Sequence, residues 1–160
     1  MATFWGKNKY IDKDLEKKFK PTSKIGNLMW IDDVNNLIAI SVKDGMKPKY
    51  IFESKNFKGY SVSSNQKEVG GKSGLGRAVG GGFLFGPTGA IVGAVTGKKD
   101  SESVINSLLV RVELEYNGNT VYETIPVIFM QKIKLDSNTY KYIEMEMAEL
   151  VSYMDDLLNK

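Results

Sequence analysis

The stretch SVINSLLVRVELEYNGNTVYETIPVIF, residues 103–129, decides the fold class because it carries a complete β-hairpin pattern. In its first half, polar side chains alternate with Val110, Val112 and Leu114, a period of two that gives a strand one buried and one wet face. The Asn-Gly pair at residues 117–118 is the strongest short-range signal for a tight hairpin turn. The stretch therefore predicts two long antiparallel strands, and Pro126 predicts that the second lies at a sheet edge or ends there.

Shorter β signals precede this hairpin. Two apolar runs are separated by a turn rich in Asp and Asn, which predicts another hairpin. A further turn is expected to direct Phe57 into the core and to be followed by a single strand. In total the sequence predicts about six or seven antiparallel strands, and the first four span residues 25–31, 37–42, 49–52 and 60–69.

A helix is predicted at each end of the strand region. Residues 1–21 form a basic helical segment, which an apolar stripe anchors and Pro21 closes. Residues 136–159 form a C-terminal helix with Asp136 or Ser137 as N-cap. The stripe of the first helix is Ile11, Leu15 and Phe19, and the seam of the second is Tyr140, Ile143, Met147, Leu150, Met154 and Leu157. The seam is too short for a coiled coil and is expected to pack on the chain's own sheet.

These elements predict a β-rich α+β fold. The expected layout is a bent antiparallel sheet or partial barrel with a C-terminal capping helix, as in pleckstrin-homology-like (PH-like) domains. The expected domains are the N-terminal segment 1–21 and a PH-like domain over residues 22–160. Within that domain, residues 70–99 are read as an inserted glycine-rich hairpin.

Composition narrows the function classes. The 160 residues include no cysteine and no histidine, which removes the usual nucleophile systems and zinc sites built on those ligands. We therefore expect no enzyme, no cofactor and no metal, and we interpret the pairs Asp32-Asp33 and Asp155-Asp156 as surface charge. A net charge of +3 with scattered lysines does not favour a nucleic-acid partner. The absence of cysteine and of a signal-peptide run favours the cytoplasm, with the inner face of the membrane as a peripheral site.

The most unusual segment is GRAVGGGFLFGPTGAIVGAVTGKK, residues 76–99. A phosphate-binding loop does not fit, because the required first glycine before Gly71-Lys72-Ser73 falls on Gln66. A single membrane crossing does not fit either, since Gly86-Pro87 breaks the helix and predicted strands flank the segment on both sides. What remains is a helical hairpin that turns at Gly86-Pro87, or else a flexible loop.

The hairpin interpretation assigns a role to each residue type in this segment. Glycines at four-residue spacing allow close packing of helices, bulky side chains contact lipid or a partner, and basic flanks keep both ends on one side of a membrane. The packing glycines are Gly82, Gly86, Gly89, Gly93 and Gly97; the apolar contacts are Phe83, Leu84, Phe85, Ile91, Val92 and Val95; the basic flanks are Lys72, Arg77, Lys98 and Lys99. The hairpin could enter one membrane leaflet, pack against other copies, or fold back on its own domain.

With its flanks at residues 50–69 and 103–119, this glycine-rich signature resembles that of small proteins of Gram-positive bacteria and their phages. In those proteins it interrupts a bacterial PH-like domain. The resemblance covers residues 25–129; the cysteine-rich zinc module that many relatives carry at the N-terminus is replaced here by MATFWGKNKYIDKDLEKKFK. It implies a PH-like fold with a glycine zipper, and no catalytic residue.

Two functional hypotheses follow. The first is a non-enzymatic binding module of phage or prophage type, which self-associates as a homo-oligomer or attaches peripherally to an anionic membrane surface through the hairpin. The alternative is a phage effector that binds a host defence protein, which it inhibits or which senses it.

Overall fold

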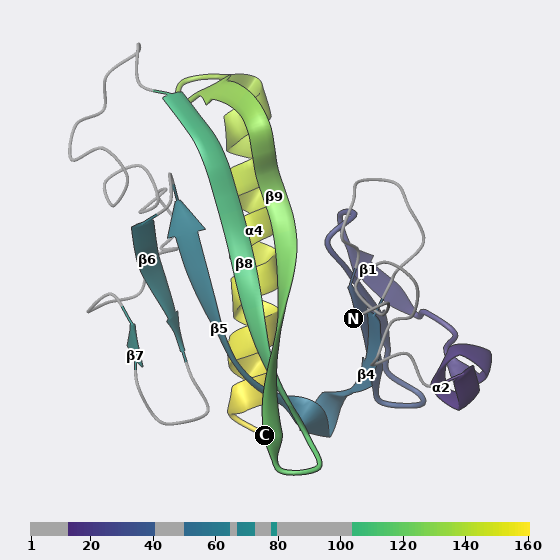
Figure 1. The fold of residues 1–160 in the computed structure, drawn as a ribbon. Coiled ribbons are helices and arrows are strands. Elements are labelled where there is room, and N and C mark those ends of the chain that lie inside the picture. Colours follow the sequence, from purple (N-terminus) through teal and green to yellow (C-terminus); the bar gives the residue numbers. More distant parts are fainter. Residues whose placement is uncertain (1–12, 41–49, 65–66, 73–77, 80–103) are drawn as a thin grey trace, which may run out of the picture. The chain divides into compact units, whose positions relative to one another are not determined.

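The computed structural model describes residues 13–40, 50–64, 67–72, 78–79 and 104–160. The chain divides into two compact units, Met1–Asn56 and Phe57–Lys160, which are called the first and the second unit below. Figure 1 shows the elements of both units in sequence colours. The expected glycine-rich hairpin falls almost entirely outside the described residues.

The first unit is a four-stranded antiparallel meander in the order β1-β2-β3-β4, with a short helix beside it. Its elements are α2 (Lys13–Lys18), β1 (Ser23–Ile25), β2 (Met29–Asp32), β3 (Leu37–Ile40), β4 (Tyr50–Glu53) and the 3-10 turn η1 (Ser54–Asn56). The predicted strand over residues 25–31 is wrong in part, because this run holds the end of β1, a turn and β2. Gly26 makes that turn feasible with a φ of 51°, a conformation that costs glycine little.

One face of this sheet packs against α2 and the residues that follow it. Leu37, Ala39 and Ile51 form a buried cluster, and the half-buried Leu15 and Phe19 pack on it together with Trp30. The anchoring stripe expected in the N-terminal segment is therefore confirmed for Leu15 and Phe19, whereas Ile11 lies outside the described residues.

Asp32 ties the β2–β3 turn to the residues after α2. Its Oδ2 accepts hydrogen bonds from the backbone N–H of Lys20 and from the side-chain amide of Asn35, both at 2.8 Å. Its Oδ1 accepts from the backbone N–H of Val34 at 3.1 Å and of Asn35 at 3.0 Å. These bonds, above all that from the Asn35 amide, lower the pKa of the Asp32 carboxyl. The interpretation of Asp32 as surface charge is wrong, since only 1% of the residue is exposed, whereas Asp33 is exposed.

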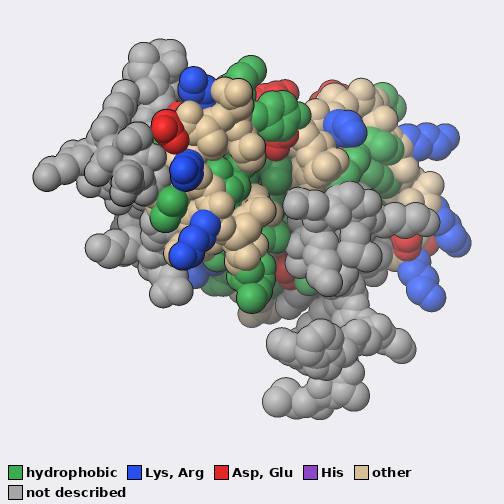
Figure 2. Space-filling view, turned by 90° about the horizontal axis from the view of Figure 1, so that it is seen from above, with side chains coloured by type: hydrophobic (Ala, Val, Ile, Leu, Met, Phe, Trp, Pro, Cys, Tyr) green, Lys and Arg blue, Asp and Glu red, His purple; other side chains and the backbone are tan. Residues whose placement is uncertain are grey.

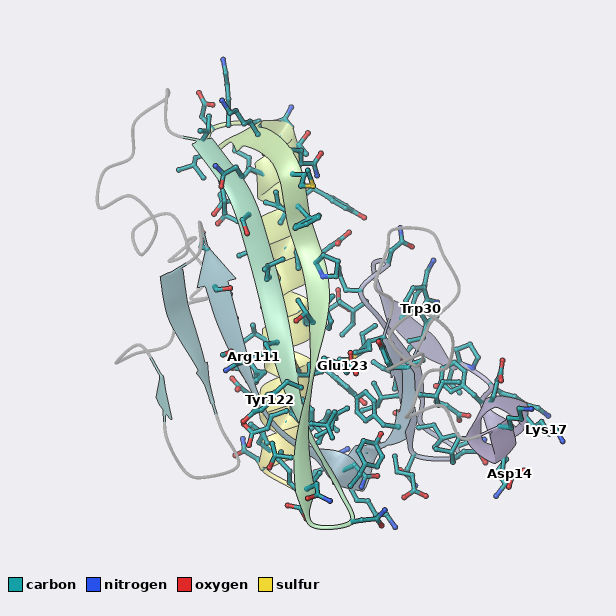
Figure 3. The ribbon with its side chains drawn as sticks, in the orientation of Figure 1. Asp14, Lys17, Trp30, Arg111, Tyr122 and Glu123 are labelled. Carbon is teal, nitrogen blue, oxygen red and sulfur yellow. The ribbon has the colours of Figure 1, made fainter. Side chains whose placement is uncertain are left out.

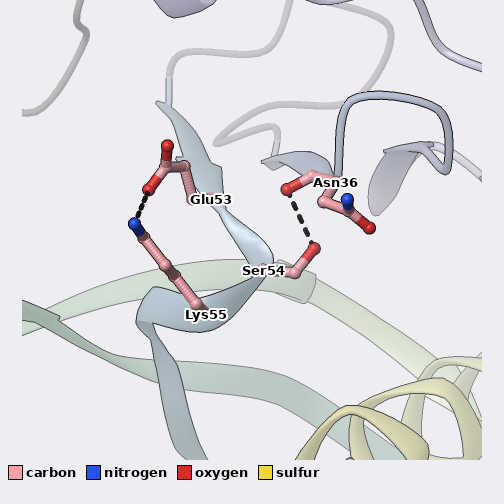
Figure 4. Close-up of polar contacts among 4 residues, drawn as sticks. All are labelled: Asn36, Glu53, Ser54 and Lys55. Carbon is pink, nitrogen blue, oxygen red and sulfur yellow. Dashed lines mark hydrogen bonds and ion pairs between the residues drawn. The ribbon is translucent and has the colours of Figure 1, made fainter.

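The end of β4 is fastened to the same turn. The hydroxyl and the backbone N–H of Ser54 both donate to the carbonyl oxygen of Asn36, at 3.0 and 2.9 Å (Figure 4). Asn36 has a φ of 55°, a left-handed conformation that asparagine tolerates better than most residues. An exposed ion pair of 3.0 Å between Lys55 and Glu53 accompanies this contact and adds little stability.

The second unit is a five-stranded antiparallel sheet in the order β7-β6-β5-β8-β9, with one long helix. Its elements are β5 (Phe57–Ser64), β6 (Lys67–Lys72), β7 (Ala78–Val79), β8 (Val104–Tyr116), β9 (Asn119–Lys134) and α4 (Asn138–Leu158). Phe57 is buried as expected. The predicted single strand over residues 60–69 is wrong, because β5 and β6 pair with each other as a hairpin. The described residues thus hold nine strands rather than six or seven.

The long hairpin of β8 and β9 is confirmed. Both turn residues have positive φ, 52° for Asn117 and 78° for Gly118, which is typical of a type I′ turn. Val110, Val112 and Leu114 are buried and their neighbours in β8 are more exposed, so the predicted alternation holds. β9 is an edge strand, as Pro126 predicts, but it continues past the proline to Lys134.

Helix α4 packs along β5 and β9 (Figure 1). Ser137 is its N-cap, and the Ser137 Oγ accepts a 3.1 Å hydrogen bond from the N–H of Tyr140. The predicted seam faces the sheet: its fully buried members are Tyr140, Met147, Leu150 and Met154, while Ile143 and Leu157 are half-buried. The seam therefore belongs to the core of this unit, as expected from its length.

Candidate interaction surface

The glycine-rich segment connects β7, at one edge of the five-stranded sheet, to β8. β7, which ends at Val79, is antiparallel to β6; β6 is antiparallel to β5; and β5 is antiparallel to β8, which begins at Val104. β7 and β8 are therefore antiparallel, so the chain leaves β7 toward the end of the sheet at which β8 begins, which we call the insertion end. Three strand intervals, about 14 Å at the usual spacing, separate the two strands sideways. The registers place Val79 level with Arg111, so Val104 also lies seven residues, about 23 Å, further along the sheet.

Exposed apolar side chains gather at the insertion end. Val104 begins β8 and is 37% exposed, while Phe129 lies opposite Ser107 in the adjoining part of β9 and is 61% exposed. Met130 follows with 85% exposure. Since β9 ends at Lys134 and α4 begins four residues later, the first turns of α4 lie at the same end and add Tyr142 and Met145, 62% and 70% exposed. Figure 2 is a view from above of the orientation in Figure 1 and shows apolar, basic and acidic side chains on one face.

The charges at the insertion end are mixed. Its exposed cations are Lys132, Lys134 and Lys141, and its carboxylates are Asp136, Glu144 and Glu146. The hydrogen bond of the Tyr142 phenol to Glu146 raises the pKa of that tyrosine, with a smaller electrostatic contribution from the same carboxylate. Lysine stems beside exposed methionine and aromatic side chains form an amphipathic surface, which suits an interface rather than a catalytic centre.

A second exposed feature lies on the face of the sheet opposite the buried row of Val110, Val112 and Leu114. The guanidinium carbon of Arg111 on β8 lies 4.6 Å from the ring centroid of Tyr122 on β9 (Figure 3). Tyr122 is 50% exposed, so this cation–π contact holds an aromatic ring at the surface of the hairpin.

The site residues predicted from the sequence lie outside the described part of the chain, with one exception. Lys72 ends β6 and pairs with Ala78 of β7, so this basic flank is next to the start of the segment. The others, which stay predictions, are Arg77, Gly82, Phe83, Leu84, Phe85, Gly86, Gly89, Ile91, Val92, Gly93, Val95, Gly97, Lys98 and Lys99.

Sequence reasoning missed the exposed residues Phe129, Met130, Tyr142 and Met145. Tyr142 and Met145 fall off the helical seam, a signal that would have identified them as outward-facing. Phe129 and Met130 are consecutive apolar residues in a strand, so they cannot both face the core, and Met130 adopts a φ of 55°.

The carboxylates of the described residues do not group into a candidate metal site. No cluster of three or more potential metal-ligating carboxylates occurs among them. In the second acidic pair, Asp156 is exposed but Asp155 is half-buried and accepts a hydrogen bond from Tyr60, so it is not free surface charge. Among the same residues, no helix has the length and apolar character needed to cross a membrane.

A family model described as glycine zipper containing PH domain matches residues 13–128. The chain therefore belongs to the family of glycine-zipper-containing PH domains. No curated protein and no solved structure gives a significant match. PH-like domains are generally non-catalytic modules that bind proteins or lipids, and this defines the chain as an interaction module.

Proposed function

We propose that the chain is a non-enzymatic module that attaches peripherally to an anionic membrane surface through its glycine-rich hairpin and the insertion end. The observation that carries this proposal is the antiparallel relation of β7 and β8, which directs the chain out of β7 toward the end of the sheet at which β8 begins. Residues 80–103 can then enter one leaflet and return without disturbing any strand pairing.

The composition of the segment supports a shallow insertion. An arm of about ten residues reaches roughly 15 Å as a helix, which is half of a bilayer core. Gly82 and Gly86 in one arm and Gly89 and Gly93 in the other would allow the arms to touch, so that the bulky side chains face lipid. Lys98 and Lys99, which precede β8, would lie among anionic headgroups, while Lys72 and Arg77 flank the segment on its β7 side.

The proposed domain organisation is compatible with membrane attachment. Residues 22–160 act as the PH-like domain, and the insertion of residues 70–99 extends from this domain. The C-terminal helix over residues 136–159 caps the domain. The N-terminal segment 1–21 supplies further lysines, of which Lys13, Lys17 and Lys18 lie on α2 and are exposed (Lys17 is labelled in Figure 3). Each well-placed lysine contributes about 1 kcal/mol of attraction to an anionic surface.

Flotation with liposomes tests membrane attachment. The full-length chain is mixed with vesicles of phosphatidylcholine alone or with added phosphatidylserine, and bound protein is measured after density centrifugation. The double variant Phe83→Ser/Phe85→Ser and the double variant Phe129→Ser/Met130→Ser remove apolar side chains from the segment and from the insertion end. Val34→Ser is the matched control, because Val34 is 78% exposed but belongs to the first unit.

We expect the unchanged chain and the Val34→Ser control to float with anionic vesicles, and both double variants to lose most of that binding. A chain that does not float with anionic vesicles would overturn the proposal. If light scattering then shows a mass of several chains that the Phe83→Ser/Phe85→Ser variant lowers, the segment serves self-association instead. A single stoichiometric host protein captured from a Gram-positive lysate would favour the phage-effector alternative.

A further inference from the structure

β9 is an outermost strand of the five-stranded sheet, and its edge away from β8 is called the free edge below. β9 is last in the strand order, and one of its edges pairs with β8 along the whole hairpin. Within the described ranges, no strand pairs with its other edge. An exposed strand edge is a template for pairing with another strand unless the chain protects it.

The two halves of β9 differ in that protection. The second half contains Pro126, register shifts at residues 126–133, the left-handed Met130, and Lys132 and Lys134. Proline, bulges and lysine are the devices by which proteins prevent edge pairing. The first half, residues 119–125, pairs with residues 110–116 in unbroken register and contains none of these devices. This half is therefore competent to accept a further strand.

The hairpin register determines which peptide groups face that edge. Asn119 pairs with Tyr116 across a two-residue turn, so these two residues exchange hydrogen bonds, and bonded pairs then alternate along the strands. It follows that Thr120, Tyr122 and Thr124 direct their N–H and C=O groups away from β8, toward the free edge. Thr120 and Thr124 are exposed, and Tyr122 is 50% exposed.

We propose that residues 119–125 of β9 pair antiparallel with the same residues of a second copy, about a two-fold axis at Tyr122. The outward-facing row reads Thr-Tyr-Thr and is therefore symmetric about its centre. The axis sets Tyr122 opposite Tyr122 of the second copy. It also sets Thr120 of each copy opposite Thr124 of the other. Each of these three pairs can exchange two backbone hydrogen bonds, which makes the interface isologous.

The side chains favour this register over its neighbours. Threonine pairs and aromatic pairs are favourable cross-strand neighbours. Arg111 already stacks on the Tyr122 ring at 4.6 Å, so each ring would be held in place from its own sheet. An axis at Glu123 would oppose two carboxylates, and an axis at Thr124 would set Tyr122 opposite Pro126, which has no N–H to donate. The pairing involves a few residues only, so the dimer forms in a concentration-dependent manner.

Disulfide trapping in the full chain tests the register, because the chain has no native cysteine. Directly opposed, hydrogen-bonded residues have Cα atoms about 5.5 Å apart, within the range of about 4.4–6.8 Å that a disulfide accepts. Tyr122→Cys is thus expected to give a covalent dimer on mild oxidation. Thr124→Cys alone is the matched control, since two copies of residue 124 would be about 14 Å apart in this arrangement.

A second trapping experiment leaves Tyr122 unchanged. An equimolar mixture of Thr120→Cys and Thr124→Cys chains is expected to form the mixed disulfide, whereas each variant alone is not. Circular dichroism shows whether all variants keep the fold of the unchanged chain.

Equal trapping of all three single variants, or no trapping of Tyr122→Cys and of the mixture, would overturn the proposal. The result is independent of membrane attachment, because the liposome assay probes residues 83, 85, 129 and 130 and the trapping probes residues 120–124. Either proposal can therefore fail while the other stands.

Discussion

The phenol of Tyr60 on β5 donates a 2.7 Å hydrogen bond to Oδ1 of Asp155 in the last turns of α4, 95 residues further along the chain. This bond joins the C-terminal part of the helix to the middle of the five-stranded sheet. Burial of Tyr60 raises the pKa of its phenol far above the ordinary value of 10.0, and the hydrogen bond and charge of Asp155 raise it further.

Tyr60→Phe removes the donor and leaves the half-buried Asp155 carboxylate without it. We expect the free energy of unfolding to fall by about 1.5–3 kcal/mol, the range for hydrogen bonds to charged groups. Chemical denaturation at neutral pH measures the change. Asp156→Asn is the control, because Asp156 is exposed one residue further on and its replacement should leave the midpoint unchanged.

Tyr140→Phe should not lower the free energy of unfolding and is expected to raise it. The Tyr140 hydroxyl is buried in the second unit without a hydrogen-bond partner, so its removal relieves a desolvated polar group. We expect equal or greater stability at neutral pH, measured in the same denaturation series. A loss of more than about 1 kcal/mol would mean that the hydroxyl has a partner in solution.

Stability should decline in alkali. Burial raises the pKa values of Tyr60 and Tyr140 above the ordinary 10.0 in the folded chain. An unfolded tyrosine ionises near 10, so the stabilising contribution is complete below that pH and is lost as the pH rises above it. Unfolding midpoints measured between pH 8 and 11 should fall, less steeply in the Tyr140→Phe variant. A midpoint that rises over this range would contradict the assignment.

The two faces of α4 offer a matched pair of methionines. Met147 is fully buried against the sheet, whereas Met145 is 70% exposed at the insertion end. Met147→Ala should cost about 2–5 kcal/mol through loss of burial and the cavity left behind. Met145→Ala should stay within about 0.5 kcal/mol, and in the liposome assay it should weaken binding. Thermal and chemical unfolding of both variants checks the contrast.

Gly118→Ala probes the turn of the long hairpin. No atom lies within 4 Å of the position that a Cβ would occupy, so the cost is conformational and not steric. At a φ of 78° it should be about 1–2 kcal/mol. Asn117→Gly serves as the control, because glycine also accepts positive φ and should leave the stability nearly unchanged. If Gly118→Ala and Asn117→Gly changed the stability equally, residue 118 would not require a left-handed backbone conformation.

The sequence alone predicted the elements whose signal lies within a short stretch of the chain. Alternation in Val110–Leu114 predicted the buried face of β8, the Asn-Gly pair predicted its turn, and the seam of the C-terminal helix predicted the side that faces the sheet. In the strand and the helix, burial on one side imposes a period of two or of about 3.6 residues, and in the turn the Asn-Gly pair meets a local need for positive φ.

Elements that depend on one glycine or on long-range pairing could not be predicted in this way. The run of residues 25–31 reads as one strand because the turn at Gly26 interrupts it without a polar cluster. Asp32 reads as a surface residue, and only the partners Lys20 and Asn35 show why it is buried. The insertion end was missed because it assembles β8, β9 and α4 from positions far apart in the sequence.

The direction in which the chain leaves β7, toward the end of the sheet where β8 begins, has a consequence for how this fold can vary. The connection needs only enough residues to span from Val79 to Val104, and no ladder register depends on how many more it contains. The insertion can therefore be lengthened, shortened or exchanged between relatives while the sheet and its helix stay as they are. The scaffold and its insertion are in this respect separate evolutionary parts, and graft experiments that swap residues 80–103 between family members should retain the fold.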